Sequence, residues 1–139
     1  MNAVFVDTSA IVALFDRSDE RHAEAKALME IVRKNRLKLI LTDYIFDECL
    51  TTALANTGHE IAVKVGEFIL NSNVTSIIWL DEPLKMKAWD YFKRYSDKRY
   101  SFTDCTSFLV MKEKKLNYFF AFDEDFTKAG FIDFSKRFR

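Results

Sequence analysis

The chain has little of what builds elaborate loops, disulfide frameworks or zinc sites. It contains three glycines, one proline, two cysteines and two histidines among 139 residues. Cys49 and Cys105 stand apart in apolar patterns, which excludes a C-x-x-C zinc site and predicts buried, reduced thiols. Because glycine and proline are scarce, we expect short connections and a single domain over residues 1–139.

Long apolar runs and an excess of one charge are also absent. No uninterrupted apolar segment approaches the roughly 20 residues of a membrane span, and 21 basic residues balance 21 acidic ones. The opening residues lack a basic leader and an apolar signal core, so we expect a cytoplasmic protein without membrane contact. Neutral net charge argues against bulk electrostatic capture of nucleic acid, but it is compatible with a local basic groove.

Short apolar strands alternate with helical patterns along the chain. Strands are predicted over residues 3–6, 37–41, 74–80 and 118–122, and amphipathic helices fill the intervals. This alternation is typical of a parallel sheet covered by helices on both faces. We therefore predict an α/β fold, a three-layer α/β/α sandwich with a central parallel sheet of four to five strands. The aromatic tail, with Phe131, Phe134 and Phe138, is expected to pack against the protein.

Acidic residues follow the predicted strands or lie in the first turns of the next helices. Asp7 follows the first strand, Glu48 lies in the helix after the second, and Asp104 lies near the start of a late helix. Asp123 and Asp125 follow the last strand. Ligands of parallel sheets bind beyond the carboxyl ends of the strands. For each acid taken alone, helix capping or a solvated helix face is the favoured explanation.

Capping signals distinguish some of these acids from others. Thr8 and Ser9 could each cap the first helix, which would leave the carboxylate of Asp7 free. Ser101 and Asp104 have the spacing of a capping box, so a structural role competes with a functional one at Asp104. Helix caps are also predicted at Asp43 and Asp81.

Carboxylates that meet at one sheet edge would imply a metal ion. Their mutual repulsion in a partly desolvated cleft is costly unless a cation lies between them. Oxygen ligands without His or Cys favour Mg²⁺ or Mn²⁺, and ions held in this way support phosphodiester hydrolysis. His22 and His59 fall in predicted helices away from the strand ends, which argues against histidine-driven cleavage of RNA.

Four segments, in order, resemble the PIN-domain ribonucleases, in particular the VapC-type toxins of toxin–antitoxin modules. The resemblance spans nearly the whole chain, and its most specific segment is the first. The segments are Val4–Ala10 with Asp7, Thr42–Thr51 with Glu48, Ser101–Asp104, and Ala121–Phe126 with Asp123 and Asp125.

The resemblance implies a site as well as an activity. The implied catalytic acids are Asp7, Glu48, Asp104 and Asp123, and the implied metal ligands are Asp7, Asp104, Asp123 and Asp125. Glu48 is preferred to Asp47, and Asp123 to Asp125. Thr8 and Thr103 would supply hydroxyls that orient carboxylates or water. The implied protein is an Mg²⁺- or Mn²⁺-dependent endoribonuclease that leaves a 5′-phosphate and a 3′-hydroxyl. It would form a homodimer and bind an antitoxin near the acids.

Basic and aromatic residues interleave just before Asp104. Lys93, Arg94, Lys98 and Arg99 could contact RNA phosphates while the neighbouring aromatic rings stack on bases. A solvated helix end explains this segment equally well.

Three other functions are weighed against the toxin. A PIN-family nuclease could process RNA without an antitoxin, and a catalytically inactive module could bind metal or RNA. A receiver-like module would need a phosphoacceptor Asp at the end of a central strand and a Lys after a late strand. Neither residues 39–42 nor residues 118–123 supply that arrangement.

Overall fold

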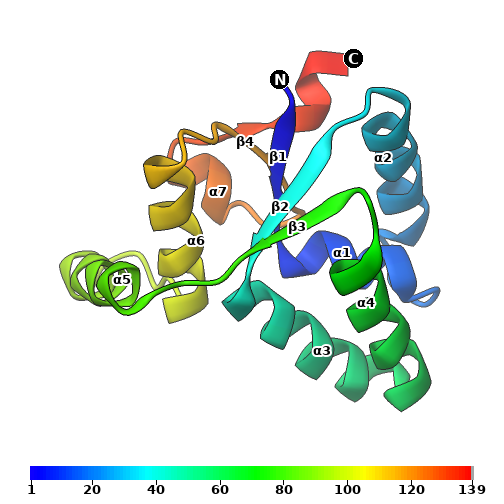
Figure 1. Cartoon of the computed structure of the whole chain (residues 1–139), viewed down its shortest axis with the longest axis horizontal. Coiled ribbons are helices and arrows are strands. Elements are labelled where there is room, and N and C mark those ends of the chain that lie inside the picture. The colour runs from blue at the N-terminus through cyan, green and yellow to red at the C-terminus, as the bar shows by residue number, and fades with distance from the viewer. Residues whose placement is uncertain (139) are drawn as a thin grey trace.

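The computed structural model describes residues 1–138 and contains a five-stranded sheet between layers of helices (Figure 1). The strands are β1 (Ala3–Val6), β2 (Lys38–Thr42), β3 (Thr75–Ile78), β4 (Tyr118–Phe120) and β5 (Ile132–Asp133). Their order in the sheet is β3-β2-β1-β4-β5, and all neighbours pair in parallel. The predicted three-layer α/β/α sandwich with a parallel sheet is confirmed.

Helices cover both faces of the sheet. They are α1 (Thr8–Phe15), α2 (His22–Lys34), α3 (Asp43–Thr57), α4 (His59–Asn71), α5 (Glu82–Arg94), α6 (Phe102–Glu113), α7 (Asp125–Lys128) and the 3₁₀ helix η1 (Phe134–Phe138). In Figure 1, α1, α2 and α4 lie on one side of the strands, and α6 and α7 lie on the other. Helix α5 packs outside α6, and α3 runs below the carboxyl ends of the strands. No helix in the described range has the length and apolar character needed to cross a membrane.

The strand order reverses between β1 and β4. Chain connections run outward from β1 through β2 to β3, then cross back to β4 on the other side of β1. Phe5 is therefore in register with Ile40 on one side and Phe119 on the other. Parallel sheets of this kind bind ligands beyond the carboxyl ends of the strands, at the point of reversal. The residues directly after β1 and β4 accordingly occupy the position where a site is expected.

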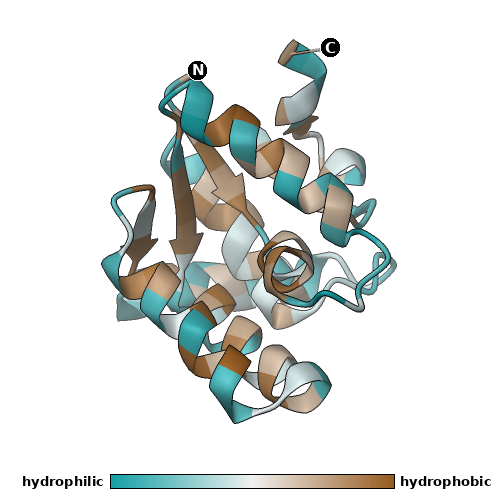
Figure 2. Ribbon diagram, turned by 90° about the vertical axis from the view of Figure 1, so that its right-hand side faces the viewer, coloured by the Kyte–Doolittle hydropathy of each residue, from teal (hydrophilic) through white to brown (hydrophobic). Residues whose placement is uncertain are grey.

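The central strands are apolar because helices cover both of their faces. Val4, Phe5 and Val6 of β1 are fully or almost fully buried, and Figure 2 shows the strands brown while the helices alternate between brown and teal. Phe126 of α7 joins this core, with its ring 5.0 Å from that of Phe108 and 5.2 Å from that of Phe119.

Caps fix where the helices begin. The Thr42 hydroxyl caps α3 by accepting the Ile45 N–H at 3.2 Å, and Asp81 caps α5 as predicted. The predicted cap at Asp43 is wrong, because Thr42 takes that position. The Asp43 carboxylate instead accepts the Leu80 N–H at 3.0 Å and holds the connection after β3.

The C-terminal segment contains elements too short to have a periodicity. Strand β5 has two residues and α7 has four, and neither was predicted as an element of its own. The expectation that the aromatic tail packs is confirmed for Phe134, which is fully buried with its ring 5.1 Å from that of Phe120. Phe138 remains 38% exposed.

Candidate active site

Asp7 lies at the carboxyl end of β1, next to the reversal point. Its side chain is only 5% exposed, and its backbone N–H donates to the Phe120 carbonyl at 3.0 Å. Asp7 itself occupies the N-cap position of α1, so the expectation that Thr8 or Ser9 would cap this helix is wrong. The carboxylate nevertheless makes no capping hydrogen bond, as predicted, and is available for chemistry.

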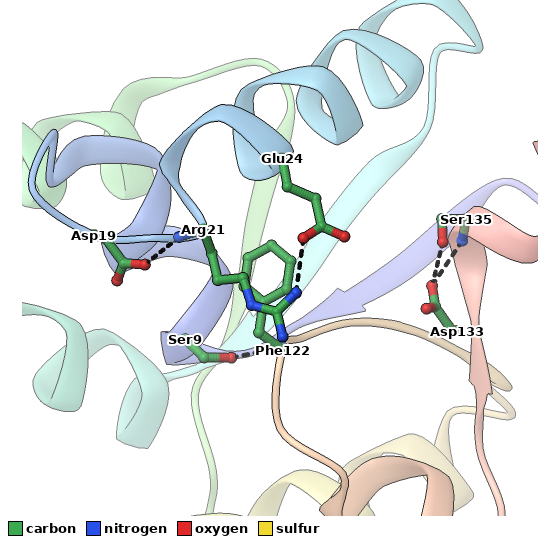
Figure 3. Close-up of polar contacts among 7 residues, drawn as sticks. All are labelled: Ser9, Asp19, Arg21, Glu24, Phe122, Asp133 and Ser135. Atoms are coloured by element: carbon green, nitrogen blue, oxygen red, sulfur yellow. Dashed lines mark hydrogen bonds and ion pairs between the residues drawn. The ribbon is translucent and has the colours of Figure 1, made fainter.

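Ser9 connects the ends of β1 and β4. Its hydroxyl donates to Asp7 Oδ2 at 3.2 Å and accepts the Phe122 N–H at 3.0 Å, the second bond being drawn in Figure 3. Sequence reasoning treated Ser9 only as a possible cap and missed this contact, although the Asp-x-Ser spacing is a usable signal for it. The Thr8 hydroxyl, in contrast, is buried and has no hydrogen-bond partner within residues 1–138.

The Arg21 side chain lies beside the residues that follow β4. The Arg21 guanidinium is 5.5 Å from the centre of the Phe122 ring and donates to Glu24 at 2.9 Å (Figure 3). Its backbone N–H donates to Asp19 Oδ1 at 2.8 Å, which fixes the turn before α2. Arg21 thus packs on the residue that precedes Asp123.

The other predicted acids come from three different elements. Asp123 follows β4 and accepts the Asp125 N–H at 3.1 Å, which begins α7. Asp104 lies in the first turn of α6 and forms the predicted capping box with Ser101, with both hydrogen bonds at 3.0 Å. Glu48 lies in α3.

Exposure separates Glu48 from its acidic neighbour but does not favour Asp123 over Asp125. Glu48 is half-buried, whereas Asp47 faces solvent. Asp123 and Glu124 are both exposed, whereas Asp125 is half-buried. The Glu124 carboxylate lies 3.5 Å from the Lys128 ammonium.

The carboxylates are close enough to perturb one another. Burial raises the pKa of Asp7 well above its ordinary value, and the nearby charges of Asp123 and Glu48 raise that pKa further. Burial also raises the pKa of Asp104, with the charges of Asp125 and Asp123 adding to it against the opposing Ser101 hydrogen bonds. The structure therefore brings Asp7, Glu48, Asp104, Asp123 and Asp125 into one electrostatic cluster. We call these five residues the acidic cluster.

The donors of the acidic cluster are chemically suited to a hard divalent cation. All are carboxylate oxygens, and the orphaned Thr8 hydroxyl is a further buried oxygen beside Asp7. Within residues 1–138, no three acidic, His or Cys side chains are already gathered tightly enough to hold a metal ion. The cluster is thus a set of mutually repelling acids whose unfavourable charge a cation would relieve.

The histidines lie away from the acidic cluster, whereas the buried Cys49 thiol lies close enough to Thr8, Asp7 and Glu48 for these residues to affect its pKa. His22 Nδ1 lies 2.8 Å from the Ala13 carbonyl oxygen, and His59 begins α4. The prediction of buried, reduced thiols is confirmed, because Cys49 and Cys105 are buried and form no disulfide. Burial raises the pKa of both thiols, that of Cys105 to about 11, so neither is a thiolate nucleophile at neutral pH.

The four predicted RNA-contacting cations lie at the end of α5 and in the turn that follows, and all are exposed. Lys93 and Arg99 line a cavity whose wall includes Tyr100. Arg94 lines a different hollow between α5 and α6, and the Lys98 ammonium lies 3.9 Å from the Asp97 carboxylate. Thr103 lies in the first turn of α6, next to Asp104.

A parallel α/β/α sheet with acids around its reversal point defines the class of this protein. The chain belongs to the PIN-domain family, whose model matches residues 4–132. The resemblance inferred from the four sequence segments is therefore confirmed.

Individual relatives within that family are nucleases. The chain is 34% identical over 131 residues to the 23S rRNA-specific endonuclease VapC20 of Mycobacterium tuberculosis, covering 94% of this chain and 96% of the relative. It is 32% identical over 116 residues to a VapC ribonuclease of Archaeoglobus fulgidus, covering 82% and 73%. The crystal structure of VapC20, described as a sarcin–ricin loop cleaving toxin, superposes with a TM-score of 0.84 at 32% identity. That match covers 94% of this chain and 97% of VapC20.

Proposed function

We propose that this protein is a divalent-metal-dependent endoribonuclease that hydrolyses RNA phosphodiester bonds and acts as the toxin of a toxin–antitoxin module. The observation that carries the proposal is the acidic cluster, in which a buried Asp7 lies beside like charges from two other elements. Membership of the PIN-domain family and the nuclease activities for which its relatives are named support it.

The residues proposed to bind Mg²⁺ or Mn²⁺ are Asp7, Asp104, Asp123 and Asp125, with Glu48 as a further catalytic acid. When bound, the metal supplies an activated water and neutralises charge on the phosphate oxygens. The Ser9 hydroxyl fixes the orientation of the Asp7 carboxylate, and the capping box with Ser101 does the same for Asp104. The hydroxyls of Thr8 and Thr103 lie beside these acids and are proposed to orient carboxylates or water.

The substrate is proposed to reach the cluster along the exposed cations Lys93, Arg94, Lys98 and Arg99. Their charges would bind phosphates in a chain whose overall charge is neutral. The name of VapC20 specifies 23S rRNA, which makes ribosomal RNA the first substrate to test.

The oligomeric state and the protein partner are proposed from the resemblance to the PIN-domain toxins. Residues 1–139 would form a single PIN-like domain that assembles as a homodimer, binds an antitoxin near the acids and acts in the cytoplasm. Two buried, unpaired thiols support a reducing compartment.

The test is cleavage of purified cellular RNA by the isolated protein, freed of any partner. Discrete products are expected with Mg²⁺ or Mn²⁺, and none with EDTA or with the Asp123→Asn variant. The Asp47→Asn variant is the matched control, because Asp47 is exposed and is expected to leave cleavage unchanged. Metal-independent cleavage, or full activity of Asp123→Asn, would overturn the proposal. RNA binding without cleavage would instead favour the inactive binding module.

A further inference from the structure

A cavity of about 300 Å³ lies where the end of α5 meets its connection to α6. Its volume is at the lower end of the roughly 300–1,000 Å³ that small-molecule sites occupy, and it suits one flat ring system. Two large aromatic side chains on α5, Trp89 and Phe92, line this cavity and are 45% and 39% exposed. Exposed aromatic rings that line a hollow mark a binding surface.

The two exposed rings stack against each other, and a cation lies beside this aromatic platform. The rings of Trp89 and Phe92 are nearly parallel, at an interplanar angle of 19° and a centroid distance of 5.9 Å. The Lys93 ammonium lies 5.5 Å from the Trp89 ring centroid. Aromatic platforms with adjacent cations are the surfaces on which single-stranded RNA bases stack.

The inner wall of the cavity leads to the start of α6, the helix that carries Asp104. Tyr100 lines the cavity and is only 7% exposed. Tyr100 is followed by Ser101, whose hydroxyl accepts the Asp104 N–H at 3.0 Å, so the wall of the cavity adjoins the cap that holds Asp104. The Phe92 ring also contacts that of Phe102, which begins α6 two residues before Asp104.

Charge favours a polyanion as the occupant. Residues 93–99 carry four cationic side chains and one acidic side chain, in a chain whose basic and acidic residues balance overall. Of these cations, Lys93 and Arg99 line the cavity itself. The Lys93 ammonium also lies 3.3 Å from Asp90 Oδ1, so an RNA phosphate would share this cation with that carboxylate. An apolar protein segment seated here would have to cover the charge of Arg99, whereas an RNA phosphate would pair with it.

We propose that this cavity is a nucleobase subsite for the RNA strand next to the bond that is cut. A base stacks on Trp89 and Phe92, and Arg99 and Lys93 bind the adjoining phosphates. This inference rests on the proposed ribonuclease function and adds the place where a neighbouring nucleotide is held.

Tryptophan fluorescence tests the subsite directly, because the chain has two tryptophans. In the Trp79→Phe variant, Trp89 is the sole emitter, and short single-stranded RNA in EDTA is expected to quench its emission saturably. The Trp89→Phe variant is the matched control, since it leaves Trp79, which is 62% exposed and outside the cavity. Adding Arg99→Ala to the Trp79→Phe variant is expected to weaken the quenching of Trp89 emission by RNA. Fluorescence anisotropy of labelled RNA measures total binding in parallel.

Two binding outcomes would overturn the subsite. RNA that binds by anisotropy without quenching Trp89, or that quenches both tryptophans equally, excludes the cavity. Trp89 emission that changes with protein concentration in the absence of RNA would assign the platform to contacts between copies of the chain.

Kinetics separate this inference from the proposed function. With Mg²⁺ or Mn²⁺, Trp89→Leu is expected to raise KM by about 5- to 100-fold and to leave kcat nearly unchanged, whereas Trp79→Leu changes neither. A lowered kcat with unchanged KM would overturn the subsite. If the wild-type protein cleaves no RNA yet Trp89 quenching saturates, the nuclease proposal fails and the cavity is a nucleobase-binding site of a protein that cuts no bond.

Discussion

Replacing Asp7 by asparagine is expected to stabilise the metal-free protein while abolishing cleavage. The Asp7 side chain is 5% exposed, and like charges from Asp123 and Glu48 surround it. Asparagine has nearly the same shape, and its amide oxygen can still accept the Ser9 hydroxyl. The substitution therefore removes mainly an unfavourable buried charge. We expect the free energy of unfolding to rise by about 0.5–2 kcal/mol, and Tm to rise by roughly 2–8 °C.

The pH dependence of this gain has a definite sign. The pKa of Asp7 is raised in the folded protein, so the folded state binds this proton more tightly than the unfolded chain, where an Asp has a pKa of about 3.9. The stability that the folded protein gains from binding this proton is fully present below the unfolded-state pKa. It is lost as the pH rises through the pKa of Asp7 in the folded protein. Asparagine does not titrate, so the advantage of Asp7→Asn is largest at neutral to alkaline pH and vanishes toward about pH 4.

Thermal unfolding of wild type and Asp7→Asn, across pH and in EDTA or Mg²⁺, is the assay. Metal that binds only the folded wild-type protein should raise its Tm by mass action, and this rise should be largely lost in the variant. The reasoning is refuted if Asp7→Asn is less stable than wild type in EDTA at about pH 8. It is also refuted if Mg²⁺ raises the Tm of both proteins equally.

Three further substitutions test separate parts of the account. Glu48→Gln should lower the cleavage rate by at least about 100-fold, whereas Asp47→Asn should leave the rate unchanged. If a cleavage assay shows that both variants change the rate equally, Glu48 is not part of the site. Ser9→Ala should weaken metal affinity or activity by roughly 10–100-fold, measured by calorimetry and initial rates, and Ser9→Thr should restore part of the loss. Thr42→Ala should lower the free energy of unfolding by about 1–2 kcal/mol, because it removes the buried cap of α3. Denaturant unfolding measures that loss, and Thr42→Ser is expected to recover only the part due to the cap, because it still removes a buried methyl group.

Local patterns made the first four strands and the caps at Asp81 and Ser101 predictable. The first strand has the predicted bounds, 3–6, because four consecutive apolar residues end at a single acid. Ser101 and Asp104 form the predicted capping box because its two hydrogen bonds depend only on residues three apart. The order of the acids along the chain likewise indicated which ones meet, since parallel strands bring their carboxyl ends to one edge.

Long-range contacts were not predictable in the same way. Ser9 reaches the Phe122 N–H across 113 positions in sequence, and no local pattern reports a bond of that span. Asp43 was predicted to be a cap because Asp at the start of a helix often caps it. Its actual partner, the Leu80 N–H after β3, lies 37 positions away and leaves no local signal. The stacked pair of Trp89 and Phe92 is spaced like an ordinary core-facing pair of a helix, and only the packing of α5 outside α6 leaves it exposed.

The central claim is that the acidic cluster holds the metal that cleaves RNA. The most direct measurement is an anomalous difference map from a crystal of the wild-type protein soaked in Mn²⁺. The account predicts a Mn²⁺ peak bound by Asp7 and Asp123 with further acids of the cluster, and no such peak in Asp7→Asn crystals. A peak held by other residues, or no peak in crystals of a protein that cleaves RNA with Mn²⁺, would contradict it.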